Sequence, residues 1–234
     1  MNDRERMALR ADILFTYDTR GRMLCSNDPE RRPAPRVFLG CTPDGNVIRF
    51  GQDVADDLAR RLEAVAERRP PGDDLRIPPA TLAAMQEVLR RLAPATVDGG
   101  GPAYRFPASI SQPRVQGDVV QITTANIDAV RDSYPWLIEE LADWGPCFAV
   151  VRDGAAVSVC FTSRNGERAT EAGVETLPDF RGQGYATAAT AAWGAFIAAG
   201  GRIPLYSTGW DNLASQAVAR RAGLVMFGAD ASLA

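Results

Sequence analysis

The 234-residue sequence contains no histidine and no lysine, so all 26 of its basic residues are arginine. The absence of histidine excludes a Ser-His-Asp triad, a Cys-His pair and any histidine metal ligand. The absence of lysine excludes Schiff-base chemistry and the lysine of a P-loop. If the protein is an enzyme that moves protons, carboxylates and hydroxyls must therefore carry them.

Cysteine is scarce, and long apolar runs are missing. The four cysteines, Cys25, Cys41, Cys147 and Cys160, form no CxxC pair, which argues against a metal site and predicts buried, reduced thiols. No run of about 18 apolar residues is present, so we expect no membrane span and no membrane partner. Residues 1–10 are charged and lack the apolar core of a signal peptide, which predicts a cytoplasmic protein.

The charge balance and the composition predict a globular protein that does not bind nucleic acid. The net charge is -3, whereas a nucleic-acid-binding protein needs an excess of basic residues to neutralise phosphates. Hydrophobic residues make up 46% and aromatic residues 8%, as in soluble globular domains. A chain of this length buries roughly 70% of its unfolded surface, so folding requires neither a metal nor a disulfide.

The sequence pattern separates into two parts near residue 115. Turn residues and helical spacing predict a small α/β region over residues 1–115. Its expected elements are a strand at 13–17, a hairpin around Pro43-Asp44-Gly45, and helices at 54–65 and 82–92, the first of them ended by Pro70-Pro71-Gly72. The glycine- and proline-containing stretch from Asp98 to Gly117 is the best linker candidate.

The second part, residues 116–234, has the pattern of an α+β domain with a mixed, mainly antiparallel sheet flanked by helices. Asp153-Gly154 and Asn165-Gly166 are hairpin signals between expected strands. The expected helices cover 125–144, broken or kinked at Pro135, then 184–199 and 212–222. The expected strands cover 119–122, 147–152, 155–162, 169–177, 203–207 and 224–228.

The segment Thr176–Ala186, with the sequence TLPDFRGQGYA, carries the clearest functional signal. A strand ends, a loop containing Gly182 and Gly184 turns, and a helix begins, so several backbone N–H groups at the helix N-terminus lack intrahelical partners. Glycine lacks the Cβ atom that would keep a ligand away from the main chain, and Arg181 adds a cation. Such a loop can bind a diphosphate through its backbone. The alternative is an ordinary strand-to-helix turn that uses glycine for its geometry.

This segment resembles the signature of the GNAT superfamily of N-acetyltransferases, R/Q-x-x-G-x-G/A, which Arg181, Gly184 and Ala186 satisfy. The helix that begins with Asn212–Ser215 is similar to the N-x-x-S/A helix of that family. The resemblance covers about residues 118–228. It implies a GNAT-like fold for the second part of the chain. It also implies transfer of an acetyl group from acetyl-CoA to an amine of a small molecule or peptide, by direct attack of the amine on the thioester.

The resemblance further implies where acetyl-CoA binds. Its pantetheine arm would pair like an additional strand with the strand at 169–177, which requires the strand at 203–207 to diverge from it. The residues expected to contact the coenzyme are Val174, Thr176, Arg181, Gly182, Gln183, Gly184, Tyr185, Ala186, Thr187, Asn212 and Ser215. Asn212 is also the expected N-cap of its helix.

Glu171 and Glu175 are the candidates for the base that deprotonates the amine. They are four residues apart on an expected strand, so both side chains lie on the same face. They form the one paired-carboxylate arrangement near the expected coenzyme site. In some members of the family a glutamate near the position of Glu171 is the base. The alternative is that both are solvent-facing strand residues.

The acid that protonates the departing thiolate is less evident. Many members of the family carry a tyrosine seven residues after the asparagine for this purpose, and here that position is Ala219. Hydroxyls at the end of the strand at 203–207 can substitute. Ser207 is the predicted catalytic residue, and Tyr206 and Thr208 are the other candidates.

The C-terminus is shorter than the family pattern, which usually continues the sheet with two further strands. Only residues 224–234 follow the last helix, so we expect an exposed strand edge that the first part of the chain, or a second subunit of a homodimer, covers. The first part is compatible with a substrate-recognition domain, a dimerisation element or a degenerate second half of the same fold. Two other functions remain open: a catalytically silent module that binds acyl-CoA, and a binder of another phosphate ligand.

Overall fold

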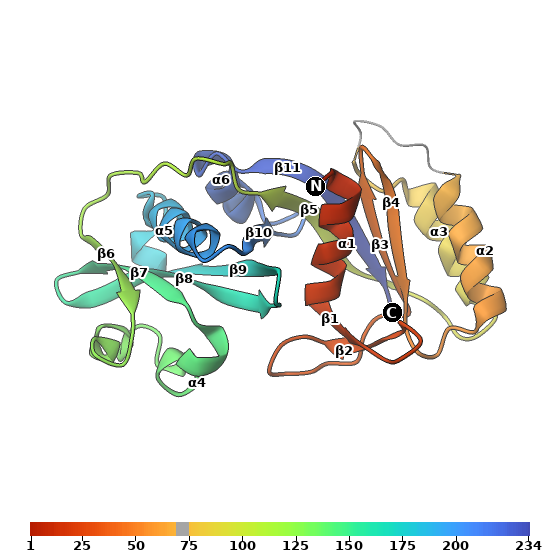
Figure 1. The fold of residues 1–234 in the computed structure, drawn as a ribbon, viewed down its shortest axis with the longest axis horizontal. Helices are drawn as coiled ribbons and strands as arrows, with labels where there is room; N and C mark the ends of the chain where they lie inside the picture. The colour runs from red at the N-terminus through yellow and green to blue at the C-terminus, as the bar shows by residue number, and fades with distance from the viewer. Residues whose placement is uncertain (69–74) are drawn as a thin grey trace. The chain divides into compact units, whose positions relative to one another are not determined.

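The computed structural model describes residues 1–68 and 75–234, and its chain folds into two compact units (Figure 1). The first unit comprises Met1–Ala103, Ser207–Asp211 and Met226–Ala234, and the second comprises Tyr104–Tyr206 and Asn212–Val225. The chain therefore first passes from the first unit to the second after Ala103, earlier than the boundary that the sequence predicted near residue 115. The chain then returns twice to the first unit, which a division into two consecutive segments does not anticipate.

The first unit is built on a sheet whose strands are hydrogen-bonded in the order β4-β3-β11-β5, and β1 pairs separately with β2. Its elements are α1 (Asp3–Leu14), β1 (Phe15–Tyr17), β2 (Met23–Ser26), β3 (Val37–Thr42), β4 (Gly45–Phe50), α2 (Asp56–Glu67), α3 (Pro79–Leu89), most of β5 (Val97–Arg105) and most of β11 (Val225–Leu233). The predicted hairpin around Pro43-Asp44-Gly45 is confirmed, because β3 and β4 pair antiparallel up to Thr42 and Gly45.

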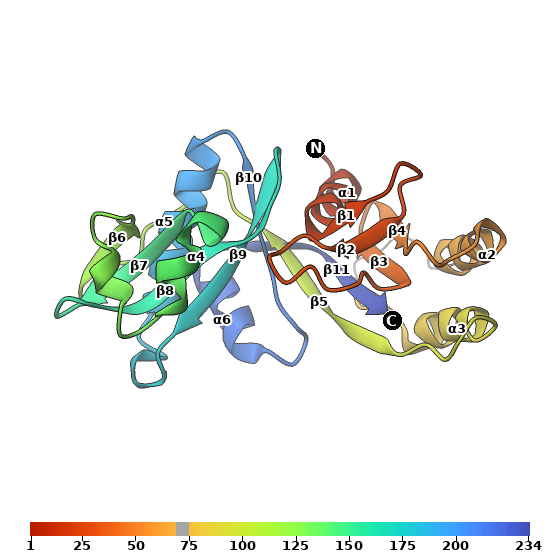
Figure 2. The ribbon, with the colours of Figure 1, turned by 90° about the horizontal axis from the view of Figure 1, so that it is seen from below.

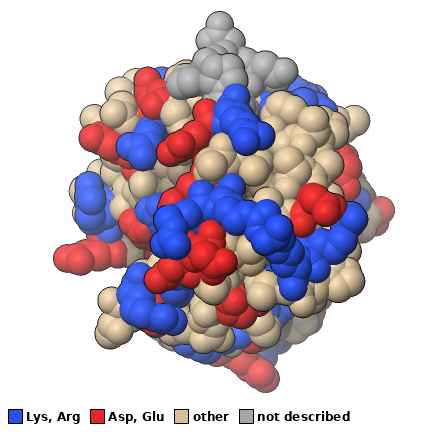
Figure 3. Space-filling view, turned by 90° about the vertical axis from the view of Figure 1, so that its right-hand side faces the viewer, with Lys and Arg blue, Asp and Glu red and all other residues tan. Residues whose placement is uncertain are grey.

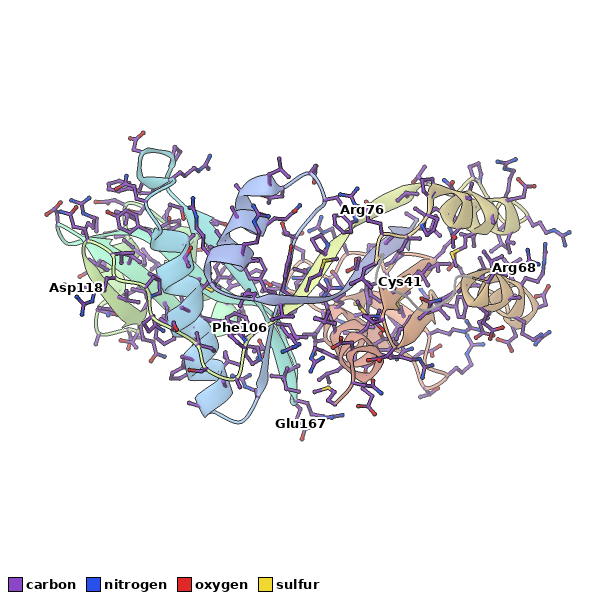
Figure 4. All side chains as sticks on the ribbon, turned by 90° about the horizontal axis from the view of Figure 1, so that it is seen from above. Cys41, Arg68, Arg76, Phe106, Asp118 and Glu167 are labelled. Carbon is purple, nitrogen blue, oxygen red and sulfur yellow. The ribbon has the colours of Figure 1, made fainter. Side chains whose placement is uncertain are left out.

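Successive residues of β3 face two different helical layers, as the alternation of a strand requires. Cys41, labelled in Figure 4, belongs to a buried cluster that includes Leu62 of α2 and Met85 of α3. Gly40 faces α1, and the Cγ atom of Met7 lies 2.4 Å from the position that a Cβ atom on Gly40 would take. Figure 1 accordingly shows α1 on one side of this sheet and the pair α2 and α3 on the other.

The C-terminal strand β11 has neighbours on both edges. Leu233 lies opposite Val37 and Ala231 opposite Leu39 in the antiparallel β3–β11 pairing, and β5 is the neighbour on the other side. The expectation that the first part of the chain covers this edge is therefore confirmed. The strand runs to Leu233, beyond the predicted end at 228, because β3 supplies partners for the additional residues.

The chain begins with a helix that the sequence analysis did not predict, and this helix takes the first two residues of the strand predicted at 13–17. Asn2 and Glu5 form a capping box in which each side chain accepts a hydrogen bond from the backbone N–H of the other residue, at 2.8 and 3.0 Å. The helix that starts there runs to Leu14, so the predicted strand at 13–17 is reduced to β1. The Pro70-Pro71-Gly72 segment, expected to end the next helix, lies outside the described residues.

The glycine run at 99–101 lies within β5, so the prediction of a linker is wrong for residues 98–105. A Cβ atom on Gly101 would lie 1.9 Å from the carbonyl oxygen of Thr208, and one on Gly100 would lie 2.5 Å from that of Asp230. These glycines let neighbouring main chains approach closely. Composition alone does not separate this role from flexibility.

The second unit contains a mixed sheet with strand order β10-β9-β8-β7-β6, in which β10 is parallel to β9 and the other pairs are antiparallel. Its elements are β6 (Asp118–Ile122), a 3-10 turn η1 (Ile127–Val130), α4 (Trp136–Trp144), β7 (Cys147–Arg152), β8 (Ala155–Asn165), β9 (Ala169–Thr176), a 3-10 turn η2 (Pro178–Phe180), α5 (Tyr185–Ala199), most of β10 (Ile203–Ser207) and α6 (Leu213–Arg221). The predicted α+β class is confirmed.

Helices cover both faces of this sheet, with α5 on one side of β7, β8 and β9 and α4 on the other (Figures 1 and 2). A buried cluster joins Leu137 of α4 to Val159 and Phe161 of β8. On the opposite face, Trp193 of α5 donates a hydrogen bond from Nε1 to Thr162 Oγ1 at 3.2 Å. The predicted break at Pro135 is confirmed, because α4 begins directly after it, while the part of the segment before Pro135 forms only the 3-10 turn η1.

A tight contact between Phe106 and α5 gives a prediction about stability (Figure 4). A Cβ atom on Gly194 would lie 2.2 Å from the Phe106 ring, so Gly194→Ala should destabilise the second unit by about 1–3 kcal/mol, as overpacking does. Gly200→Ala is the matched control, because its Cβ atom would lie no closer than 3.4 Å to a neighbour and its φ is -78°. Urea denaturation measures both. Equal midpoints for the two variants would contradict this packing.

Charged side chains of both signs are interspersed on the face of the first unit that carries α2 and α3 (Figure 3). Asp56, the first residue of α2, forms an ion pair with Arg22, whose Nη2 atom lies 2.5 Å from Oδ1. None of the helices within residues 1–68 and 75–234 is long and apolar enough to cross a membrane.

The four cysteines are free thiols, as predicted. Cys41, Cys147 and Cys160 are buried, and Cys25 is half-buried. Burial raises the pKa of Cys147 to about 12 and raises the pKa of Cys160 well above its usual value. Both thiols therefore stay protonated near neutral pH and are poor nucleophiles.

Candidate functional site

The predicted glycine loop connects η2 to α5 and presents its main chain. Gly182 and Gly184 adopt φ angles of +77° and +86°, a region that side-chain-bearing residues rarely occupy. The first hydrogen bond of the helix runs from Ala188 N to Gly184 O at 3.1 Å. Within the described residues, none of the N–H groups of 182–187 donates to another backbone group. A row of unused donors therefore stands at the positive end of a helix dipole.

The space in front of both glycines is open. A Cβ atom on Gly182 would meet no described atom within 4 Å, and one on Gly184 would meet only Val115, whose Cγ1 atom lies 3.7 Å away. Tyr185 and Thr187 turn their side chains into the core, where they are 2% and 4% exposed. These two residues can offer a ligand their backbone, while their side chains hold the helix in place.

The polar side chains of the loop bind local carbonyl groups. Arg181 is exposed and donates from Nε to the carbonyl oxygen of Thr176 at 3.3 Å. Gln183 donates from Nε2 to the carbonyl oxygen of Asp179 at 3.2 Å. Both contacts are surface hydrogen bonds to neutral acceptors, which a charged ligand can replace at low cost.

Beside the loop, β9 and β10 separate as predicted. Their parallel pairing runs from Ile203 opposite Ala169 to Leu205 opposite Glu171, and it stops there although β9 continues to Thr176. Leu177, directly after β9, donates its backbone N–H to the carbonyl oxygen of Val157 in β8, at 3.0 Å. Main-chain groups of an antiparallel strand alternate between its two neighbours, so the even-numbered residues of β9 direct theirs away from β8. The N–H and C=O groups of Val174 and Thr176 therefore point to the side that β10 has left.

The start of α6 lies next to the end of β10. Asn212 is the N-cap that its position predicted: its Oδ1 atom accepts from Ser215 N at 3.0 Å. The Ser215 hydroxyl lies 2.7 Å from the Tyr206 hydroxyl, and burial raises the pKa of Tyr206 to about 12. Ala219, one turn further along α6, is fully buried. The sequence did not indicate the pairing of Tyr206 with Ser215.

The two candidate glutamates lie on one face of β9, as predicted, but in different surroundings. Glu171 is 5% exposed and lies opposite Arg164 in the β8–β9 pairing, so it is not a solvent-facing residue. Glu175 is exposed, yet partial desolvation of its carboxyl group raises its pKa above the usual value. Between them stands Gly173, whose missing Cβ makes room for the Phe161 ring. Of the two, Glu175 has the carboxylate that a substrate can reach.

Ser207 belongs to the first unit, whereas the glutamates and the glycine loop belong to the second. Its hydroxyl accepts a hydrogen bond from Arg10 Nη2 at 2.9 Å, and Arg10 Nη1 lies 2.5 Å from Asp230 Oδ2. Thr208 donates its backbone N–H to the carbonyl oxygen of Pro102 at 3.3 Å.

Arg152 lies beside the glycine loop, and the sequence analysis did not single it out. It ends β7, and its Nη1 atom donates to the Tyr185 hydroxyl at 3.1 Å, next to the glycine loop. Strands β7 and β9 both run antiparallel to β8, so their carboxyl ends meet at the same edge of the sheet. That edge could have been derived from the predicted hairpins, but the partner of Arg152 could not.

Comparison with known proteins agrees with this geometry. A family model described as an acetyltransferase (GNAT) domain matches residues 102–225, just over half of the chain. No curated protein matches. Among solved structures, a GNAT-family acetyltransferase from Colwellia psychrerythraea is 13% identical, with a TM-score of 0.51 over 87% of this chain and 81% of its own.

Two further structures show the extent of the likeness. A GCN5-related N-acetyltransferase-like protein from Streptococcus suis is 16% identical, with a TM-score of 0.51 over 88% of this chain and 85% of its own. A GNAT-family acetyltransferase from Novosphingobium aromaticivorans is 19% identical, with a TM-score of 0.45 over 59% of this chain and 66% of its own, just under two thirds. At these identities the likeness concerns the fold. The coverage of 87% and 88% exceeds the 102–225 match, so the shared fold includes part of the first unit.

Proposed function

The chain belongs to the GNAT acetyltransferase family, and we propose that it transfers the acetyl group of acetyl-CoA to an amine of a small molecule or peptide. The observation that carries this proposal is the open row of backbone N–H groups at residues 182–187, beside a strand edge that has lost its partner. The loop fits a diphosphate and the strand edge fits an extended, amide-containing chain. Few ligands other than a coenzyme A thioester combine both.

The residues present fit the coenzyme by their chemistry. The amide groups of the loop and the dipole of α5 favour a doubly charged diphosphate, and Arg181 is free to turn its guanidinium toward it. The edge of β9 at Val174 and Thr176 offers main-chain donors and acceptors to the amides of the pantetheine arm. When Arg181 moves to the diphosphate, it releases the carbonyl oxygen of Thr176 for this pairing. When bound, acetyl-CoA supplies an activated acyl group and a thiolate leaving group.

Glu175 is the base in this proposal. Its carboxylate is exposed on β9 at the level where β10 has diverged, and its raised pKa makes it a stronger base than an ordinary glutamate. It accepts a proton from the incoming ammonium group, directly or through water, so that the amine attacks in its neutral form. Glu171 is buried opposite Arg164, and in this proposal it has a structural role and does not accept the proton.

The proton donor in this proposal is a hydroxyl at the end of β10. Tyr206, paired with Ser215, keeps its proton at neutral pH because its pKa is raised to about 12. Ser207, the catalytic residue that the sequence predicted, belongs to the first unit and accepts a hydrogen bond from Arg10, so we propose Tyr206 and not Ser207 as the donor. Tyr206 can return a proton to the sulfur atom in place of the tyrosine that Ala219 replaces.

Calorimetry and a thiol-release assay on the full chain test the proposal. We expect acetyl-CoA to bind saturably and ADP to be only a weak competitor for the same site. We also expect release of free thiol when amino acids, aminoglycosides or peptides are added as acceptors. Binding without thiol release for any amine would instead favour a catalytically silent acyl-CoA-binding module, which the buried Ala219 suggests. Binding of ADP with no competition from acetyl-CoA would overturn the proposal.

A further inference from the structure

Arg152 is fixed against the N-terminal turn of α5 by contacts that come from three parts of the second unit. Its Nη1 atom donates to the hydroxyl of Tyr185, the first residue of α5, at 3.1 Å. Its guanidinium carbon lies 6.0 Å from the centre of the Phe180 ring. These two aromatic residues flank the glycine loop in the sequence, so they hold the cation beside the loop.

The segment that precedes β6 is shaped around the same arginine. A Cβ atom on Gly117 would lie 2.8 Å from Arg152 Cγ and 2.4 Å from the carbonyl oxygen of Val151. Gly117 has a φ of +102°, which a residue with a side chain rarely adopts. Two residues earlier, Val115 reaches to 3.7 Å from the Cβ position of Gly184. This segment therefore lies along both Arg152 and the loop, and it leaves room for the arginine stem.

The charge of Arg152 is not neutralised by a close carboxylate in the described part of the chain. Arg152 forms an ion pair with Asp153, at 4.0 Å between Nη2 and Oδ2, and the Asp153 side chain is 95% exposed. An exposed pair at this distance contributes little. Arg181, in contrast, directs its Nε atom to Thr176, at the end of β9. Arg152 and Arg181 therefore both lie beside the loop, and each is held there by a different hydrogen-bond acceptor.

We infer that Arg152 binds a phosphate group that the glycine loop does not hold, namely the ribose 3′-phosphate of coenzyme A, an inference that rests on the proposed function. The N–H groups of 182–187 and Arg181 suffice for the diphosphate, which carries two charges. The 3′-phosphate is a separate dianion on the same ligand, and a planar guanidinium with free N–H groups matches its oxygens. Arg152 then selects coenzyme A over its 3′-dephosphorylated form.

The test measures the affinities of the full-length protein for coenzyme A and for dephospho-coenzyme A by calorimetry. The wild type should bind coenzyme A about 10-fold more tightly, the scale of one charge-assisted contact. In Arg152→Gln this preference should disappear, while the affinity for dephospho-coenzyme A stays within about twofold of the wild type. Thermal unfolding of the variant checks that the loss of the Tyr185 contact leaves it folded, and Arg152→Lys should retain part of the preference.

Arg202→Gln is the matched control. Arg202 follows the other end of α5 and donates to a neutral acceptor, Asn165 Oδ1, at 2.8 Å, so its replacement removes the same charge without touching the loop. It should leave both affinities unchanged. An equal loss of both affinities in Arg152→Gln would assign Arg152 to the diphosphate and overturn the inference, as would no change in either. A wild type that binds neither ligand would refute the proposed function itself, together with this inference.

Discussion

Replacement of Gly182 by tryptophan should lower the affinity for acetyl-CoA by about 100-fold or more, because charge-assisted hydrogen bonds are each worth about 1.5–3 kcal/mol and the side chain would separate the diphosphate from several donors. The wild-type loop has no described atom within 4 Å of the Cβ position of Gly182, so an added indole would occupy the space that faces the ligand. Calorimetric titration with acetyl-CoA measures the effect.

The backbone of Gly182 has a φ of +77°, so any side chain there is strained, and the control must carry the same strain. Gly201 provides it: its φ is +78°, its Cβ position is also open, and it lies beyond the C-terminus of α5. Gly201→Trp should lose similar stability and keep full affinity. If both variants bind acetyl-CoA equally well, the loop does not hold the coenzyme.

The site features that the sequence predicted are those that depend on local geometry. A left-handed glycine, an N-cap and a two-residue hairpin are each specified by a few consecutive residues. Gly184, Asn212 and the turn at Asp153-Gly154 therefore appear where they were expected. The divergence of β10 from β9 was also predicted, although from the family resemblance and not from spacing.

The features that the sequence did not predict depend on contacts between distant residues. Arg10 forms an ion pair with Asp230, 220 positions away in the sequence, and also donates a hydrogen bond to the Ser207 hydroxyl. The glycines at 100 and 101 have the composition of a flexible linker, yet they sit where the carbonyl oxygens of other segments approach. The carbonyl group near Gly100 belongs to β11 and the one near Gly101 belongs to Thr208, after β10, so no local pattern could reveal either approach.

The relative roles of the two glutamates illustrate the same limit. Strand periodicity correctly places Glu171 and Glu175 on one face of β9. It does not tell that Glu171 lies opposite Arg164, because that register depends on an irregularity in the β8–β9 pairing between residues 162 and 164. Nor does it tell that Glu171 is buried. Exposure and desolvation together, not spacing, are the reasons for proposing Glu175 as the base.

Glu175→Gln should reduce kcat for amine acetylation by about 10²–10⁴-fold, the usual contribution of a general base, while the affinity for acetyl-CoA stays unchanged. The pH profile provides a readout that a structural role would not move. Glu175 must be ionised to accept a proton, so activity falls as the pH drops through its pKa. Because desolvation raises that pKa, the acid limb of kcat/KM should lie above the ordinary glutamate value of 4.5. In Glu175→Gln this limb should vanish.

Two further glutamates separate a base from a charge effect. Glu167 lies in the turn between β8 and β9 and is labelled in Figure 4, so Glu167→Gln removes the same charge from the far end of the hairpin and should keep full activity. Glu171→Gln alters a buried residue opposite Arg164 and should reduce stability more than it reduces kcat at saturating substrate. If Glu171→Gln abolishes turnover in a folded protein while Glu175→Gln retains both turnover and the acid limb, the base is Glu171, and the buried carboxylate must reach the amine through water.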